Sequence, residues 1–494
     1  MSVSMKLHHL LYMAAAFLLL PLMCSCSSDD GSDTTINEES QIALSNHYIN
    51  LNIVIGSGNE GTMRGTPEGK ENGDGREAGF ARENLVTGVT LILYKDAAGI
   101  NTSAETTLTF INYYPVSLVS RETQGTSYSS DTKADEAIYT TGDQPLAGTG
   151  IDITETNYHA IIVANQNLAS VFTTSSKVKE VRDYVMTHIY SGDGMKLDAT
   201  HFVMSLETDY IVNFASPTSK VTNGNRTTYN FDNIRIERLA ARMDFWAKNA
   251  TYETKDKNND DYTTPGYEYP VWKSTDTTTP TSADKFVLTA VTPFNLFQGT
   301  EYLFKRTNDA SSPYLADETT TNYVLDPQWG NKTTAAVPAF VENALDDIIT
   351  NNTVKMTTAS FQTSKYTYTE STVSGDNMIV CYPKENTLSL TTPLYYYATG
   401  LAIEGDYYTD GEGTPEHLVF YGYLRHQGED DGPYIIKLSD DLDKTQTGTV
   451  PMNFGVVRNN IYRISIEKIN ERQRMEINIK VKKWDPFTHE VIYM

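Results

Sequence analysis

The chain has 494 residues, of which 39% are hydrophobic, so it can bury more than one core and form two or three domains. Its formal net charge is −24, which argues against nucleic acid and anionic membrane surfaces as partners. The acidic residues are spread through predicted loops, a distribution that is typical of an exposed surface protein kept soluble by its charge.

The N-terminus has the features of a secretion signal, predicted over residues 1–25. Lys6 supplies a positive charge, and Leu10 to Leu22 form an apolar run that is too short to span a bilayer stably. A cysteine that follows a small residue at the end of such a leader is where a bacterial diacylglyceryl group is attached. Cys26, which follows a serine, is therefore favoured as the lipidated residue over Cys24, which follows a methionine. An ordinary cleaved leader with incidental cysteines is the alternative.

Residues 26–64 contain a polar tether and a first apolar strand. Ile49, Leu51, Ile53 and Ile55 alternate with more polar residues, which predicts a strand with one buried face. Each large aliphatic side chain contributes about 1.5–3 kcal/mol when buried, so about 6–12 kcal/mol depends on this strand. That amount is comparable with the whole stability of a typical domain, about 5–15 kcal/mol. Its removal would leave an exposed core and unpaired edge groups that favour strand addition.

The segment after this strand, residues 56–82, is rich in glycine and contains Arg64, Arg76 and Arg82. Such a segment cannot bury enough apolar surface to order itself, so we expect it to be exposed and open to proteases. Arg64 lies closest to the strand and is the favoured cleavage position, with Arg76 and Arg82 as alternatives.

The rest of the chain predicts β-sandwich domains, because many short strands are separated by turn-rich spacers and only one helix is indicated, at Ser175 to Ile189. A Thr-, Asp- and Asn-rich stretch at 249–283 is interpreted as loop. The predicted domains are residues 65–245 and 246–494, and Cys381 is expected inside a buried strand. The predicted strands are 85–94, 158–165, 202–207, 234–246, 285–291, 378–382, 394–403, 417–424, 434–438, 461–469 and 475–483.

The chain ends in a partly apolar tail from Trp484 to Met494. Its apolar residues fall on both alternations of an extended strand, so its register is open: Phe487, Val491 and Tyr493 on one side, Ile492 and Met494 on the other. Pro486 lacks a donor N–H, which interrupts strand pairing there. The tail either serves as a donor strand to a neighbour or completes its own sheet.

No motif for catalysis or for a resident cofactor is present. The nine histidines form no HExxH pattern, and no nucleophile elbow or phosphate-binding loop occurs. Carboxylates gather at 256–261 and 429–431, but neither group has the spacing of a calcium loop. We therefore predict neither an enzyme nor a metal or cofactor site.

The order of these segments resembles the major fimbrillins of the Bacteroidetes, the type V pilin family. The resemblance is carried by the leader and its cysteine, the apolar strand with its arginine loop, and a set of later segments. Those segments are Asn84 to Tyr94, Tyr158 to Asn165, Arg235 to Met243, Pro293 to Phe297, Val457 to Ile464, and the last strand running into Trp484.

This resemblance implies two tandem transthyretin-like β-sandwiches and a pathway of export, cleavage and assembly. The precursor would be an outer-membrane lipoprotein on the cell surface, and an Arg-specific protease would cut it at Arg64 and release the first strand. The C-terminal strand of another copy or of a related pilin, matching Trp484 to Met494 here, would then fill the vacated place and build an adhesive fimbria. Until the cut, the attached strand outcompetes any donor through its high effective concentration.

Two other functions remain open at this point. A monomeric surface lipoprotein that binds glycans would keep its lipid and its first strand. A tip or accessory pilin would not donate its tail to a neighbour. The sequence does not identify the receptor on a host or bacterial surface.

Overall fold

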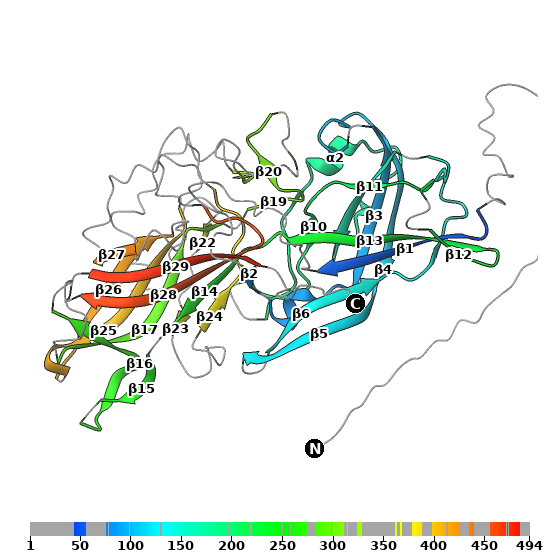
Figure 1. Ribbon diagram of the computed structural model, residues 1–494. Coiled ribbons are helices and arrows are strands. Elements are labelled where there is room, and N and C mark those ends of the chain that lie inside the picture. Colours follow the sequence, from blue (N-terminus) through cyan, green and yellow to red (C-terminus); the bar gives the residue numbers. More distant parts are fainter. Residues whose placement is uncertain are drawn as a thin grey trace, which may run out of the picture. The chain divides into compact units, whose positions relative to one another are not determined.

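The computed structural model describes twenty-three segments of the chain: 44–55, 76–77, 79–97, 99–128, 131–155, 157–194, 198–216, 220–248, 250–256, 258–273, 283–297, 299–310, 314, 324–328, 361–362, 366–367, 378–387, 398–411, 413–424, 434–438, 455–470, 472 and 474–484. Residues 44–494 form one compact unit. In Figure 1 its strands gather in two large sheets.

The first sheet follows the order β4-β3-β8-β10-β13-β1-β6-β5, with β11, β12 and β7 paired at its sides. Its strands within the described residues are β1 (His47–Ile55), β3 (Gly88–Lys95), β4 (Leu108–Pro115), β5 (Ser117–Tyr128), β6 (Asp131–Thr140), β7 (Gln144–Pro145), β8 (Tyr158–Ala164), β10 (Met204–Leu206), β11 (Tyr210–Val212), β12 (Lys220–Asn223) and β13 (Arg226–Arg238).

One hydrophobic cluster contains side chains from most strands of this sheet. Leu91 of β3, Ile162 of β8, Phe231 of β13 and Leu51 of β1 all belong to it, although β3 and β1 are not neighbours in the sheet. The cluster therefore extends across the sheet from β3 to β1. The first strand of the chain is therefore an integral part of the first core.

The second sheet follows the order β15-β16-β17-β25-β26-β27-β29-β28-β14-β24, and β16 also pairs with β28. Its strands in the described part of the chain are β2 (Arg76–Glu77), β14 (Arg242–Trp246), β15 (Thr251–Lys255), β16 (Asp261–Trp272), β17 (Lys285–Phe294), β23 (Tyr366–Thr367), β24 (Met378–Cys381), β25 (Gly400–Tyr408), β26 (Glu416–Tyr423), β27 (Tyr434–Leu438), β28 (Asn460–Asn470) and β29 (Arg474–Trp484).

A second hydrophobic cluster packs on this sheet. It includes Phe245 of β14, Phe286 of β17, Phe420 of β26 and Ile479 of β29. The pairing of β16 with both β17 and β28 brings the two ends of the strand order together, so this sheet wraps around its core. Cys381 of β24 is buried in the same cluster, as the sequence predicts.

Shorter elements join these sheets. The α-helix within the described residues is α2 (Val178–Arg182), and the 3-10 turns are η1 (Ala81–Asn84), η2 (Leu168–Ser170) and η5 (Thr409–Gly411). Three two-stranded ladders complete the set: β18 (Leu296–Phe297) with β22 (Phe361–Gln362), β19 (Glu301–Tyr302) with β9 (Val185–Met186), and β20 (Arg306–Thr307) with β21 (Val324–Leu325).

The prediction of an all-β chain with a minor helix is confirmed, with corrections to three segments. The stretch 249–283, interpreted as loop, contains β15 and β16, because its tyrosines and threonines suit a pleated strand. The helix expected over Ser175 to Ile189 is limited to α2, since β9 pairs with β19 directly after it. The strand expected over 234–246 is two strands, β13 and β14, which belong to different sheets.

The change of sheet lies between Arg238 and Arg242, where Leu239, Ala240 and Ala241 form a fully buried link. The predicted domain boundary after residue 245 falls inside β14. Because the compact unit contains both sheets, the domain boundaries stay a prediction.

Candidate functional site

The site is the position of β1 in the middle of the first sheet. On one side β1 runs parallel to β13, from His47 opposite Thr227 to Val54 opposite Arg235. On the other side it runs antiparallel to β6 and to β7. Figure 1 shows β1 lying beside β13 and next to β6. We call the space bounded by residues 227–235 of β13 and 137–145 of β6 and β7 the β1 slot.

The inner face of β1 is completely buried. Ile49, Leu51, Ile53 and Ile55 are each 0% exposed, whereas Asn50 and Asn52 between them are partly exposed. The alternation predicted from the sequence is therefore confirmed. Val54 departs from it, because its side chain is also buried although it lies on the other face.

Polar groups of the walls hydrogen-bond to β1 along its length. The Leu51 N–H donates to Thr141 Oγ1 at 3.0 Å, and the Thr141 N–H donates to the Leu51 carbonyl at 3.2 Å. Thr140 Oγ1 donates to Asn50 Oδ1 at 2.6 Å. Asn52 Nδ2 donates to Asp232 Oδ1 at 2.7 Å.

The first two residues of β1 make aromatic contacts with β13. His47 Nδ1 lies 3.1 Å from the Tyr229 hydroxyl, and the two rings stack with centroids 5.8 Å apart. Partial burial of the imidazole, together with the positive charge of Lys220, lowers the pKa of His47. The Arg226 guanidinium lies 4.0 Å from the centre of the Tyr48 ring.

A β-bulge marks the centre of the slot. Leu51 pairs with Phe231 and Ile53 with Ile234, so two steps along β1 face three steps along β13. The extra residue is therefore on β13, where Asn233 has a φ of 57°. The bulge therefore belongs to β13 and not to β1.

The chain that follows β1 is anchored by buried charge. Glu83 of η1 accepts hydrogen bonds from the Phe80 N–H at 2.7 Å, the Tyr382 hydroxyl at 2.5 Å and Arg242 Nη1 at 3.3 Å. Arg242 also donates to both oxygens of Asp244, at 2.7 and 2.9 Å. Burial, with the negative charge of Glu83, raises the pKa of Tyr382.

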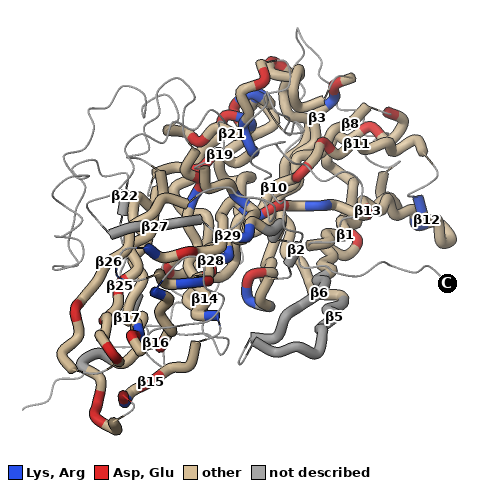
Figure 2. Tube along the Cα trace, turned by 60° about the vertical axis from the view of Figure 1, so that its left-hand side comes forward, with Lys and Arg blue, Asp and Glu red and all other residues tan. Residues whose placement is uncertain are grey.

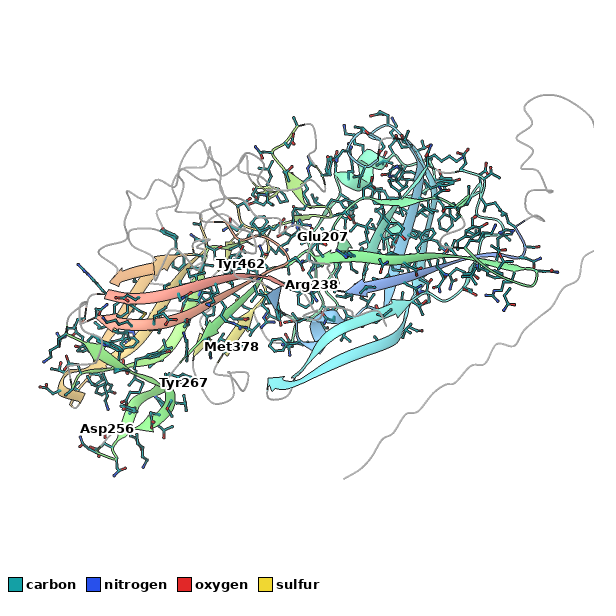
Figure 3. The ribbon with its side chains drawn as sticks, in the orientation of Figure 1. Glu207, Arg238, Asp256, Tyr267, Met378 and Tyr462 are labelled. Atoms are coloured by element: carbon teal, nitrogen blue, oxygen red, sulfur yellow. The ribbon has the colours of Figure 1, made fainter. Side chains whose placement is uncertain are left out.

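Arg238, at the end of β13, completes this anchor. Its guanidinium donates to the Glu83 carbonyl at 3.2 Å and to Asn459 Oδ1 at 3.4 Å, and it also hydrogen-bonds to Asn84. Figure 3 labels Arg238 beside the region where β13 ends, and Figure 2 shows acidic and basic positions close together near the labels of β10 and β29. We call Phe80–Asn84 with these partners the η1 anchor.

The predicted cleavage positions fall on different parts of this arrangement. Arg76 belongs to β2, which pairs in parallel with Lys483 and Trp484 at the end of β29. Arg82 belongs to η1, and its guanidinium donates to the Tyr382 hydroxyl at 3.2 Å and lies over the Phe80 ring. Arg64 lies outside the described residues.

Of the other predicted site residues, Trp484 ends β29, whereas Cys24, Cys26, Phe487, Val491 and Tyr493 lie outside the described residues. The described part of the chain contains no group of three or more metal-ligating side chains. None of its helices is long and apolar enough to cross a membrane.

The sequence predicted which side of β1 is buried but not which residues line the β1 slot. Thr140, Thr141 and Asp232 lie far from β1 in the sequence, and nothing in their neighbours marks them as its partners. The anchor residues Arg238 and Arg242 do fall within the segment Arg235 to Met243 that carried the family resemblance, and Glu83 lies next to the segment that starts at Asn84.

No family model and no curated protein matches this sequence at a significant level. Matches to solved structures do extend over most of the chain. A fimbrilin of Porphyromonas gingivalis is 13% identical, with 90% of this chain and 99% of that one covered and a TM-score of 0.40. The tip fimbrial protein of the same organism is 9% identical, with 88% and 100% covered and a TM-score of 0.37. Fimbrial proteins are thus among the structures that this chain is similar to.

Proposed function

We propose that this protein is a structural subunit of a surface fimbria that is assembled by strand exchange. The precursor is exported as a lipoprotein through Cys26, an Arg-specific protease cuts after Arg64, and β1 leaves with the lipid. The C-terminal strand of another copy or of a related pilin, Trp484 to Met494 in this chain, then occupies the β1 slot. The resulting filament serves adhesion at the cell surface.

The observation that carries this proposal is the position of β1. It is a middle strand that is hydrogen-bonded on both sides, and its inner face is fully buried. Its loss exposes two sheet edges and a strip of core at once, which is the condition under which strand addition is most favourable. With four inner side chains at about 1.5–3 kcal/mol each, about 6–12 kcal/mol is available to a replacement strand.

Arg64 is favoured as the cleavage position because the two alternative residues, Arg76 and Arg82, lie in paired or anchored elements. Arg82 lies in the η1 anchor, and Arg76 is paired with β29. A protease must bind its substrate in an extended form, which would require either element to open first. Arg64 belongs to the glycine-rich segment that joins β1 to β2.

The protein without its leader provides the test, with an Arg-specific protease and the matched variant Arg64→Lys. We expect the wild-type chain to acquire a new N-terminus at Gly65, to lose β1 and to form oligomers in size-exclusion chromatography. The variant should keep β1 and remain monomeric. Assembly of the variant after a cut at Arg76 would move the cleavage site, and a cut wild-type chain that retains β1 would contradict strand exchange.

The mature N-terminus on cells decides between this function and the glycan-binding alternative. Mass spectrometry of surface material should find chains that begin at Gly65. Chains that begin at a lipidated Cys26 and retain β1 in assembled filaments would refute the proposal.

A further inference from the structure

The polar groups that line the β1 slot point to a preference among donor strands. Resting on the function proposed above, we infer that the slot selects a strand with apolar residues at the positions of Ile49, Leu51, Ile53 and Ile55 and with an amide at that of Asn52. The tail of this chain departs from the first requirement at the position of Leu51 and from the second at that of Asn52. The slot therefore fits the tail of a different subunit better than that of a second copy.

The bulge on β13 makes this selection possible, because it fixes the register. Asn233, with a φ of 57°, is the extra residue between Phe231 and Ile234, and it remains on the wall when β1 leaves. An incoming strand must meet the bulge at one defined position to complete its hydrogen bonds. A strand displaced by one residue would also turn its apolar side chains to solvent.

Two side chains of the walls then act on the outward positions of the occupant. Asp232, next to the bulge, accepts the hydrogen bond of the Asn52 amide at 2.7 Å, and Thr140 donates to Asn50 Oδ1 at 2.6 Å. An ionised carboxylate can only accept a hydrogen bond. Asp232 therefore favours a donor on the facing strand and disfavours a second carboxylate, whereas Thr140 tolerates any group that accepts.

The sequence of the tail can be aligned with β1 by its apolar residues. The alignment of Phe487 with Ile49 puts apolar residues at four of the five buried positions of β1, with Val491, Ile492 and Tyr493 at those of Ile53, Val54 and Ile55. The two mismatches are adjacent. His489 takes the place of Leu51, which is 0% exposed, and Glu490 takes the place of Asn52.

Both mismatches weaken the tail as an occupant of its own slot. An imidazole at the position of Leu51 would be buried without the water that hydrates it. A carboxylate at the position of Asn52 would face Asp232. Asp232 would then lose the hydrogen bond from the amide and would lie next to a second negative charge. A donor with leucine and asparagine at these two positions would have neither defect.

The preference of the wall can be measured in the uncut chain, without any assembly. The variants Asn52→Glu and Asn52→Gln have side chains of the same shape and differ in charge. We expect the unfolding equilibrium constant of the Glu variant to be about tenfold larger than that of the Gln variant at low salt. In the background Asp232→Asn the difference should fall to within about threefold, as measured by a double-mutant cycle. Equal stability of the two variants in the native background would overturn the inference.

The tail is tested in the cut chain by its assembly rate. The variants Glu490→Gln and His489→Leu should each assemble faster than the wild-type chain by about tenfold, whereas the control Glu490→Asp, which keeps the charge, should not. Unchanged rates for the first two variants would refute the preference. If no variant assembles at all, the proposed strand exchange fails, and the cycle in the uncut chain still decides whether Asp232 discriminates.

Discussion

Replacing Ile53 with alanine tests how firmly β1 is held in the first sheet. The Ile53 side chain is 0% exposed, and its backbone pairs with Ile234 of β13 on one side and with Tyr139 of β6 on the other. Truncating a fully buried isoleucine costs about 2–5 kcal/mol in the free energy of unfolding. Because a typical domain is stable by about 5–15 kcal/mol, this single change should be plain in a urea titration.

The matched control is the same substitution at an exposed isoleucine. Ile211 of β11 is 65% exposed, so Ile211→Ala should change the free energy of unfolding by no more than about 0.5 kcal/mol. Both variants are measured as uncut proteins without the leader, by tryptophan fluorescence and far-UV circular dichroism. If Ile53→Ala is no more destabilising than Ile211→Ala, β1 is not part of the first core and the β1 slot does not exist as described.

Cleavage gives the same variant a second use. Once β1 has been released, the remaining chains of wild type and Ile53→Ala are chemically identical, so their stabilities should be equal. A difference that persists after the cut would mean that β1 stays bound, and it would contradict the release that strand exchange requires.

Three further predictions concern the rest of the described structure. Hydrogen bonds to Asp406 and Glu404 raise the pKa of His417 from 6.5 to about 9, so its contribution to stability should be complete below pH 6.5 and lost as the pH rises through about 9. An NMR titration of the His417 ring checks this, and a midpoint below pH 7 would contradict it. Glu83→Ala removes the central acceptor of the η1 anchor and should cost about 3–5 kcal/mol in thermal or urea unfolding, whereas the exposed control Glu180→Ala should cost under about 0.5 kcal/mol; equal effects would refute the anchor. The buried thiol of Cys381 should not react with a thiol reagent until the leaderless protein unfolds, and rapid labelling of the native state would argue against its burial.

The features that the sequence predicted well are those with a local pattern. The two-residue alternation of Ile49, Leu51, Ile53 and Ile55 is a property of adjacent residues, and their burial follows from it directly. The runs that became β8 and β29 were found for the same reason. Turn residues and hydrophobic periodicity are sufficient where an element is long and its neighbours in space do not alter it.

The features that the sequence did not predict depend on distant residues. The link Leu239–Ala241 between β13 and β14 is fully buried and apolar, so it reads as a continuous strand although the chain changes sheet there. The region after α2 has helical spacing, but Val185 and Met186 pair with β19 instead. Tertiary pairing overrides local propensity in both places. For the candidate site, the sequence predicted β1 but not the residues that line the β1 slot, because Thr140 and Asp232 contact β1 only in the folded sheet.

β1 and the η1 anchor lie on either side of residues 56–75 and are held by different kinds of contact. This difference decides which cleavage position is compatible with strand exchange. β1 contains no Asp, Glu, Lys or Arg, so it is held by apolar burial and by hydrogen bonds that another strand of similar pattern can make. The η1 anchor is held by Glu83, a buried carboxylate that accepts hydrogen bonds from the Phe80 N–H, the Tyr382 hydroxyl and Arg242. Removing a buried charged acceptor from its donors is costly, and no incoming strand would restore it.

A cut before the anchor therefore removes only replaceable contacts, and a cut within it would damage the connection between β13, β14 and β28. This requirement applies whichever subunit supplies the donor. It favours Arg64 over Arg82 on energetic grounds, independently of how easily a protease reaches either residue. A chain cut after Arg82 should accordingly unfold at lower urea concentration than one cut after Arg64, even when both have lost β1.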